Sequence, residues 1–252
     1  MTYPILEFDS NPRAVIEPGE LLRPQDAMPE HCVLCFFAEV IQTVCANAEQ
    51  VFTLKSEMGR NPVYVIDYEG KRVGVIHPGV GAPLAVGFLE ETIALGGKKF
   101  IACGGAGVLN RELTVGHAVI PVTALRDEGV SYHYLPPSRE VAASAEAVAA
   151  LQATLDAHGV PYVTGKTWTT DALYRETPGK VARRRDEGCL TVEMEAAAFF
   201  AVAQFRGVTF GQLLYGGDDL SGDVWDHRDW IGGQRTNREK LFWLAVEACV
   251  KL

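Results

Sequence analysis

The sequence lacks any long uncharged apolar run and carries few positive charges for its acidic content. Its 252 residues include 23 Lys and Arg against 32 Asp and Glu, a formal net charge of -9. Such a charge repels the phosphates of nucleic acids and anionic membranes. No stretch reaches the length of a membrane span, and the N-terminal residues lack the apolar core of a signal peptide. We therefore expect a cytoplasmic protein that binds neither nucleic acid nor membrane.

Cysteine is too sparse for a secreted disulfide scaffold. The chain has six, at positions 32, 35, 45, 103, 189 and 249. Cys32 and Cys35 form a C-x-x-C within an apolar run, with no second pair to complete a metal site and no Lys or Arg beside them to lower a thiol pKa. We predict free thiols and a core position for this pair.

No repeat, low-complexity tract or linker divides the chain, so we expect one domain over residues 1–252. From about Val63 onward, apolar strand-like runs alternate with helix-like segments, which is typical of an α/β fold. The predicted strands are Pro62–Tyr68, Arg72–Pro78, Lys99–Gly105, His117–Leu125, Pro161–Thr170, Cys189–Glu195 and Thr209–Gly217.

Capping and stop signals mark four helices between these strands. One runs from Pro83 to Leu95 and stops at a Gly-Gly pair. A long alanine-rich helix is capped by Ser138 and ends at His158, a third follows Glu195, and the last begins with a capping box at Thr236. These helices can cover the faces of a buried sheet.

The most informative segment is Val192-Glu-Met-Glu195, where carboxylates follow a buried strand. Ligands of open α/β sheets bind at the carboxyl ends of strands, and a carboxylate there can accept hydrogen bonds from the O2′ and O3′ hydroxyls of ribose. Alternatively, Glu195 only stabilises the N-terminus of the following helix through its dipole. Position alone does not separate these interpretations.

A second acidic segment, Gly216 to Asp223, ends the next strand at the same edge of the sheet. An aspartate there can protonate a departing base if burial or a like-charged neighbour raises its pKa. A solvated acidic loop is the simpler alternative. A metal site is another, but its candidate ligands match neither a calcium loop nor a zinc motif in their spacing. These candidates are Asp218, Asp219, Asp223, Asp226, His227 and Asp229. We expect no metal.

Two glycine-rich turns, His77 to Pro83 and Cys103 to Gly107, also follow strands. Their bare amides can bind an oxyanion or phosphate, although single glycines more often serve tight turns. Leu84 stands where a dinucleotide-binding motif has its third glycine, which disfavours a Rossmann dehydrogenase.

A last candidate segment is Thr167 to Thr177, where Trp168 and Tyr174 can stack on a base or pack in the core. Thr169, Thr170 and Asp171 can order this loop. The basic run Arg183-Arg184-Arg185 is interpreted as a solvated helix face.

Taken in order, these motifs resemble the nucleoside phosphorylase superfamily, the group that contains bacterial purine nucleoside and uridine phosphorylases. They are I-x-P-G with an arginine four residues later, GVGAP, GGAG, TTDALY, VEMEAA and GDD, from about Ile16 to Ser221. The resemblance implies a three-layer α/β/α domain with a mixed, partly barrel-like central sheet. It also implies a homo-oligomer, from a dimer to a hexamer.

The resemblance assigns roles residue by residue. Glu195 and Met194 hold the ribose, and Asp218, or Asp219 if the loop is offset by one, is the acid that protonates purine N7. On the base side the resemblance implies Leu173 and Tyr174, and we expect Trp168, Thr170 and Glu193 there as well. For phosphate it implies Gly19 and Arg23, to which we add the backbone amides of Gly104 and Gly105.

Two departures concern phosphate: Ala102 replaces an arginine of many members, and Gly105 replaces a serine or threonine. Thr177 and Gly179 replace the glutamine and arginine that read uracil. The implied function is therefore a purine-preferring nucleoside phosphorylase that uses inorganic phosphate as co-substrate, needs no cofactor, and releases free base and ribose 1-phosphate. Alternatives are a uridine phosphorylase, a nucleosidase that uses water, and a non-catalytic nucleoside-binding protein.

Overall fold

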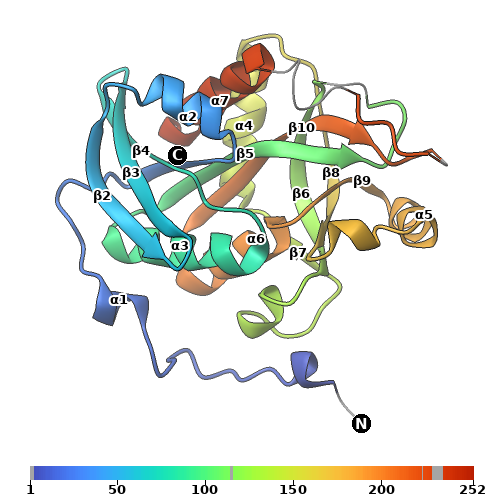
Figure 1. The fold of residues 1–252 in the computed structure, drawn as a ribbon, viewed down its shortest axis with the longest axis horizontal. Helices are drawn as coiled ribbons and strands as arrows, with labels where there is room; N and C mark the ends of the chain where they lie inside the picture. Colours follow the sequence, from blue (N-terminus) through green and yellow to red (C-terminus); the bar gives the residue numbers. More distant parts are fainter. Residues whose placement is uncertain (1–2, 114–115, 223, 229–234) are drawn as a thin grey trace.

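The computed structural model describes residues 3–113, 116–222, 224–228 and 235–252, and its centre is a ten-stranded mixed sheet (Figure 1). The strands are β1 (His31–Cys35), β2 (Glu49–Ser56), β3 (Gly59–Tyr68), β4 (Lys71–Ile76), β5 (Lys99–Val108), β6 (Ala118–Asp127), β7 (Glu140–Ala142), β8 (Tyr162–Thr170), β9 (Cys189–Glu193) and β10 (Thr209–Asp219). Their order is β10-β6-β8-β9-β5-β1-β4-β3-β2, and β7 pairs with β6. A further pairing of β10 with β5 closes one half of the sheet into a barrel, which confirms the expected mixed, partly barrel-like sheet.

Helices cover both faces of this sheet, because its central strands are apolar on both sides. Helices α3 (Ala82–Leu95) and α6 (Ala196–Arg206) pack against one face. Helices α2 (Ala38–Val44), α4 (Ala145–Ala157) and α7 (Arg235–Val250) pack against the other. The expected three-layer α/β/α arrangement is thereby confirmed. The short α1 (Pro18–Leu21) lies beside α3, α5 (Pro178–Asp186) beside β9, and three 3-10 turns complete the elements: η1 (Pro4–Leu6), η2 (Ser131–His133) and η3 (Leu173–Arg175).

All seven predicted strands exist, but two helix starts were predicted wrongly. Ser138 does not cap a helix, because the chain next forms the short strand β7, and α4 starts only after Ser144. Its hydroxyl instead accepts a hydrogen bond from Arg126 and donates one to the Glu140 carbonyl. Thr236 is not an N-cap, because α7 already includes the preceding residue.

The cysteine prediction is confirmed. All six cysteines are free and buried, and Cys32 and Cys35 lie in the central strand β1. Burial raises the pKa of the Cys32 thiol well above its ordinary value. Within the described ranges, no helix is both long and apolar enough to cross a membrane.

Candidate active site

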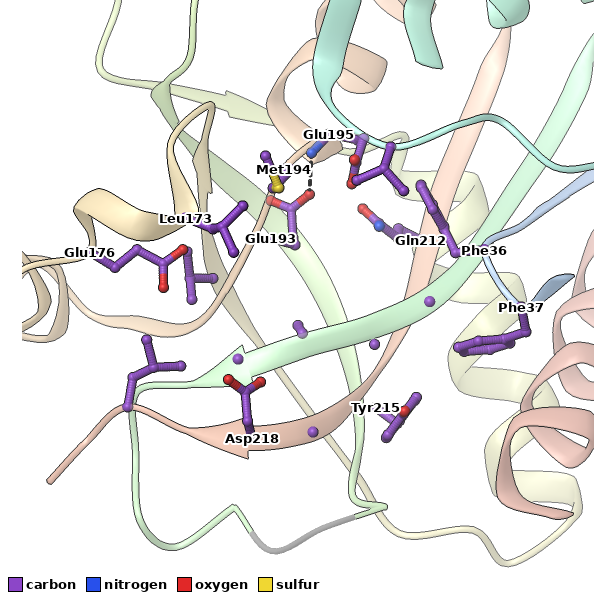
Figure 2. A pocket seen from close by; sticks show the side chains of 18 of the residues that line it. Phe36, Phe37, Leu173, Glu176, Glu193, Met194, Glu195, Gln212, Tyr215 and Asp218 are labelled. Carbon is purple, nitrogen blue, oxygen red and sulfur yellow. Dashed lines mark hydrogen bonds between the residues drawn. The ribbon is translucent and has the colours of Figure 1, made fainter. Parts of the chain in front are cut away.

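A cavity of about 340 Å³ opens where the carboxyl ends of β5, β9 and β10 meet (Figure 2). Here the closed half of the sheet brings together three segments that are far apart in the sequence. The predicted site residues that line the cavity are Gly104, Gly105, Leu173, Glu193, Met194, Glu195 and Asp218.

Glu193 fixes the turn between β9 and α6. Its carboxylate accepts hydrogen bonds from the Thr169 hydroxyl at 2.6 Å and from the backbone N–H groups of Glu195 and Ala196 at 2.7 and 2.6 Å. Burial raises the pKa of Glu193 despite these donors. Glu193 therefore satisfies the first amides of the helix and is committed to local structure.

Unlike Glu193, Glu195 does not cap the helix that follows it. It is 5% exposed, and although it occupies the N-cap position of α6, its side chain makes no capping hydrogen bond. One carboxylate oxygen instead accepts the N–H of Gly81, whose φ of +89° belongs to the glycine-rich turn before α3. Burial, and then the charge of Glu193, raise the pKa of Glu195. Because Glu193 already serves the helix terminus, the structure disfavours the purely dipolar interpretation of Glu195.

The two adjacent aspartates of β10 lie in different surroundings. Asp218 lines the cavity and accepts the indole N–H of Trp225 at 2.7 Å. Asp219 lies outside the cavity, where it pairs with the Arg228 guanidinium and accepts the Ser221 N–H. Burial acts to raise the pKa of Asp219, but these two partners hold it below its ordinary value. Of the two candidate acids, Asp218 is therefore the one that faces the cavity, and Asp219 is held in an ion pair.

Glu176 is a cavity residue that sequence reasoning missed. It follows η3, and Figure 2 shows its carboxyl group and that of Asp218 on two sides of the same space. Burial, and then the charge of Asp218, raise the pKa of Glu176 to about 7. The signal in the sequence was its position inside the candidate segment Thr167 to Thr177, where it was given no role.

The opposite end of the cavity holds a cation that the sequence gave no reason to select. Arg238 of α7 donates to the Tyr215 hydroxyl at 3.1 Å and to Glu39 at 2.7 Å, and its guanidinium lies 5.2 Å from the Phe37 ring centroid. Among the described residues that line the cavity, it is the one cation. A Cβ on Gly105 would lie 3.4 Å from the Tyr215 hydroxyl, so this cluster borders the glycine-rich end of β5.

Three predicted base-side residues lie outside the cavity. Trp168 is fully buried in a separate cluster, where its indole N–H donates to Asp127 at 3.0 Å, so neither ring face is open to a ligand. Thr170 is buried and its hydroxyl accepts the Ala172 N–H. Tyr174 is 91% exposed. None of the three lines the cavity, and their assignment to the base site stays a prediction.

The predicted phosphate residues Gly19 and Arg23 also lie outside the cavity. Both are exposed, and α1 lies against α3. Gly19 borders a second hollow that it shares with Glu90 and Arg206. Their role in phosphate binding stays a prediction.

The basic run on α5 is not uniformly solvated either. The Arg184 side chain is 8% exposed and pairs with Asp127 at 2.9 Å and Glu187 at 3.2 Å. Its guanidinium carbon lies 5.5 Å from the Trp168 ring centroid. Arg184 therefore covers the buried tryptophan.

No group of three metal-ligating side chains occurs within the described ranges. Asp223 and Asp229, which belong to the acidic segment considered above for a metal, lie outside those ranges. Asp226 and His227 do not line the cavity.

Comparisons with known proteins agree with this geometry. A family model described as the phosphorylase superfamily matches residues 30–251, a stretch that begins after Gly19 and Arg23. The chain is 29% identical to a guanosine phosphorylase of Halorubrum lacusprofundi over 58% of its own length and 61% of the relative's. It is 30% identical to a uridine phosphorylase of Thermococcus kodakarensis over 57% of each chain. Both matches span less than two thirds of the relative.

Solved structures are similar in fold. The structure of a Toxoplasma gondii purine nucleoside phosphorylase in complex with immucillin-H has a TM-score of 0.78 at 20% identity, over 91% of this chain and 96% of that one. A uridine phosphorylase of Vibrio fischeri has a TM-score of 0.77 at 20% identity, over 93% and 99%. At these identities the likeness concerns the fold.

Proposed function

The chain belongs to the phosphorylase superfamily, and from this premise we propose that it is a nucleoside phosphorylase. It cleaves the N-glycosidic bond of a ribonucleoside, purine preferred, with inorganic phosphate, and releases free base and ribose 1-phosphate. The observation that carries the proposal is the buried Glu195 carboxylate, which lines the cavity and is not used as a helix cap. The proposal includes no metal or organic cofactor.

Glu195 binds the ribose in this proposal. Its carboxylate accepts hydrogen bonds from the O2′ and O3′ hydroxyls, and Met194 packs against the sugar. Gly81 holds the carboxylate in place. Fixing the ring in this way favours the stretching of the C1′–N9 bond towards an oxocarbenium-like transition state.

Asp218 protonates the leaving purine at N7. The proton passes from its carboxyl group to the base as the C1′–N9 bond breaks, so that the base departs as a neutral molecule. Asp218 is placed for this role because it lines the cavity, close to the strand end that carries Glu195.

Phosphate binds between Arg238 and the backbone amides of Gly104 and Gly105. An oxygen of phosphate attacks C1′ from the face opposite the base, and the new C1′–O bond gives ribose 1-phosphate. Arg238 is a preorganised cation, held by Tyr215 and Glu39. Arg238 thereby supplies the positive charge that many members obtain from the arginine that Ala102 replaces here.

A nucleosidase that uses water is the second candidate. The observation in its favour is that Gly19 and Arg23 lie outside the cavity, which leaves fewer groups to bind a phosphate. In that case Arg238 would serve only to hold Tyr215 and Glu39 in place, and free ribose would be the sugar product.

We also propose that the protein works in the cytoplasm as a homo-oligomer between a dimer and a hexamer. The support is the likeness to nucleoside phosphorylases described above. Multi-angle light scattering of the purified chain measures the assembly directly, and a monomer would contradict this part of the proposal.

The function is tested by measuring base release from inosine, guanosine, adenosine, uridine and methylthioadenosine, each with and without phosphate. The proposal predicts release from purine nucleosides that depends on phosphate. A clear preference for uridine would contradict the base assignment. No release from any of the five would contradict the reaction.

A further inference from the structure

Glu176 is a carboxylic acid in the cavity for which the proposed reaction has no use. Within the part of the chain that the structure describes, its side chain has no hydrogen-bond or ion-pair partner. Lys180, the nearby cation on α5, pairs instead with Asp127 at 3.5 Å. An acceptor that lines a cavity without a partner can be satisfied by a donor on the ligand.

Apolar side chains gather beside Asp218 in the wall of the cavity. A Cβ on Gly107 would lie 2.5 Å from a methyl carbon of Leu220, 3.0 Å from one of Val192 and 3.6 Å from a carboxyl oxygen of Asp218. These three side chains therefore converge over bare backbone, and the apolar side chain of Leu173 lines the same cavity. The polar groups at this end are the carboxyl groups of Asp218 and Glu176, which point into the shared space in Figure 2.

Purine edges differ in what they offer to a carboxylate. A 6-oxopurine carries a hydrogen-bond donor at N1, and guanine adds a second donor on its 2-amino group. Adenine has a lone pair at N1 and no donor at C2. An ionised carboxylate only accepts, so it can pair with the N1 donor of a 6-oxopurine, whereas adenine offers it no donor at N1 or C2.

The two acids can satisfy both edges of a 6-oxopurine at once. The charged groups that act on Glu176 are Asp218 across the cavity and Lys180 on α5. A purine that accepts at N7 and donates at N1 is matched by a proton donor at Asp218 and an ionised acceptor at Glu176.

We propose that Glu176 is the residue that selects 6-oxopurine nucleosides, guanosine first and inosine next, over adenosine. This inference rests on the proposed function, because it takes Asp218 as the group that faces N7. Glu176 acts on the choice of substrate and takes no part in breaking the bond.

The test is the ratio of kcat/KM for guanosine to that for adenosine, measured at about pH 8, where a carboxyl group with a pKa near neutrality is ionised. The wild-type protein should prefer guanosine by roughly 10- to 100-fold, which is the value of one or two charge-assisted hydrogen bonds. In Glu176→Gln the neutral amide can also donate to adenine N1, so the ratio should fall at least about 10-fold, with adenosine improving. Asp186→Asn, an exposed acid at the end of the same helix α5, is the control and should keep the wild-type ratio.

The outcomes separate this inference from the proposed reaction. Phosphorolysis with a ratio that Glu176→Gln leaves unchanged, or an equal loss of kcat for every purine, would overturn the inference alone. Calorimetric binding of guanosine and adenosine without phosphate reads the same selectivity without turnover. Binding that discriminates through Glu176 in a protein that releases no base would support the inference and overturn the reaction.

Discussion

Replacing Glu195 with glutamine removes the charge at the centre of the site and keeps the size of the side chain. The Glu195 carboxylate is buried, and one of its oxygens is engaged by Gly81. Two hydroxyl groups of ribose would lose a charged acceptor, each worth about 1.5–3 kcal/mol. The amide oxygen retains part of this, so we expect a loss of about 3–5 kcal/mol of transition-state stabilisation, which is roughly 10²- to 10⁴-fold in kcat/KM.

The assay is kcat/KM for inosine at saturating phosphate, with thermal unfolding as a check of the fold. Glu112→Gln, at an exposed position outside the cavity, is the matched control and should behave as wild type. If Glu195 served only the helix dipole, Glu195→Gln would lower stability by about 0.3–1 kcal/mol and leave turnover nearly intact. Activity of Glu195→Gln within about threefold of wild type would refute the ribose assignment, since one charged hydrogen bond is worth more than that.

Four further predictions follow from the same contacts. Because burial and Glu193 raise the pKa of Glu195 above 4.5, kcat/KM should fall as the pH drops through that raised value, and Glu193→Gln should move this acidic limb of the pH profile to lower pH. Arg238→Gln should raise the KM for phosphate by roughly 10- to 100-fold and change the KM for nucleoside much less, as steady-state kinetics with each substrate varied will show. Asp218→Asn should lower kcat/KM for inosine by roughly 10²- to 10⁴-fold, far more than for uridine, and equal losses would count against protonation at N7. Trp168→Ala should lower the free energy of unfolding by about 3–5 kcal/mol in urea titrations, since it empties a fully buried ring site.

The fold was largely predictable because its central strands are continuous apolar runs with helical segments between them. The strands from β3 onward were predicted with the exception of β7, whereas β1, β2 and α2 were not. The residues of β2 are mostly polar and half exposed, since it is an edge strand with one neighbour. The start of α4 was misplaced because the serine at position 138 lies before the short strand β7, whose pairing with β6 depends on tertiary structure.

Site residues could be predicted only where a local sequence motif contains them. Glu195 was identified because a charged residue at the end of a buried strand is unusual. Glu176 and Arg238 come from a loop and a terminal helix, and no local pattern connects them to β9. Gly19 and Trp168 lie outside the cavity for a shared reason, since neither a short motif nor an aromatic side chain reveals which part of the fold it will contact.

The central claim is that phosphate, and not water, accepts the ribosyl group. It is tested most directly by incubating the protein with inosine and inorganic phosphate and identifying the sugar product by ³¹P NMR. The account predicts a new phosphate ester, ribose 1-phosphate, that appears in step with hypoxanthine. Release of hypoxanthine with free ribose and an unchanged phosphate signal would contradict it and establish hydrolysis.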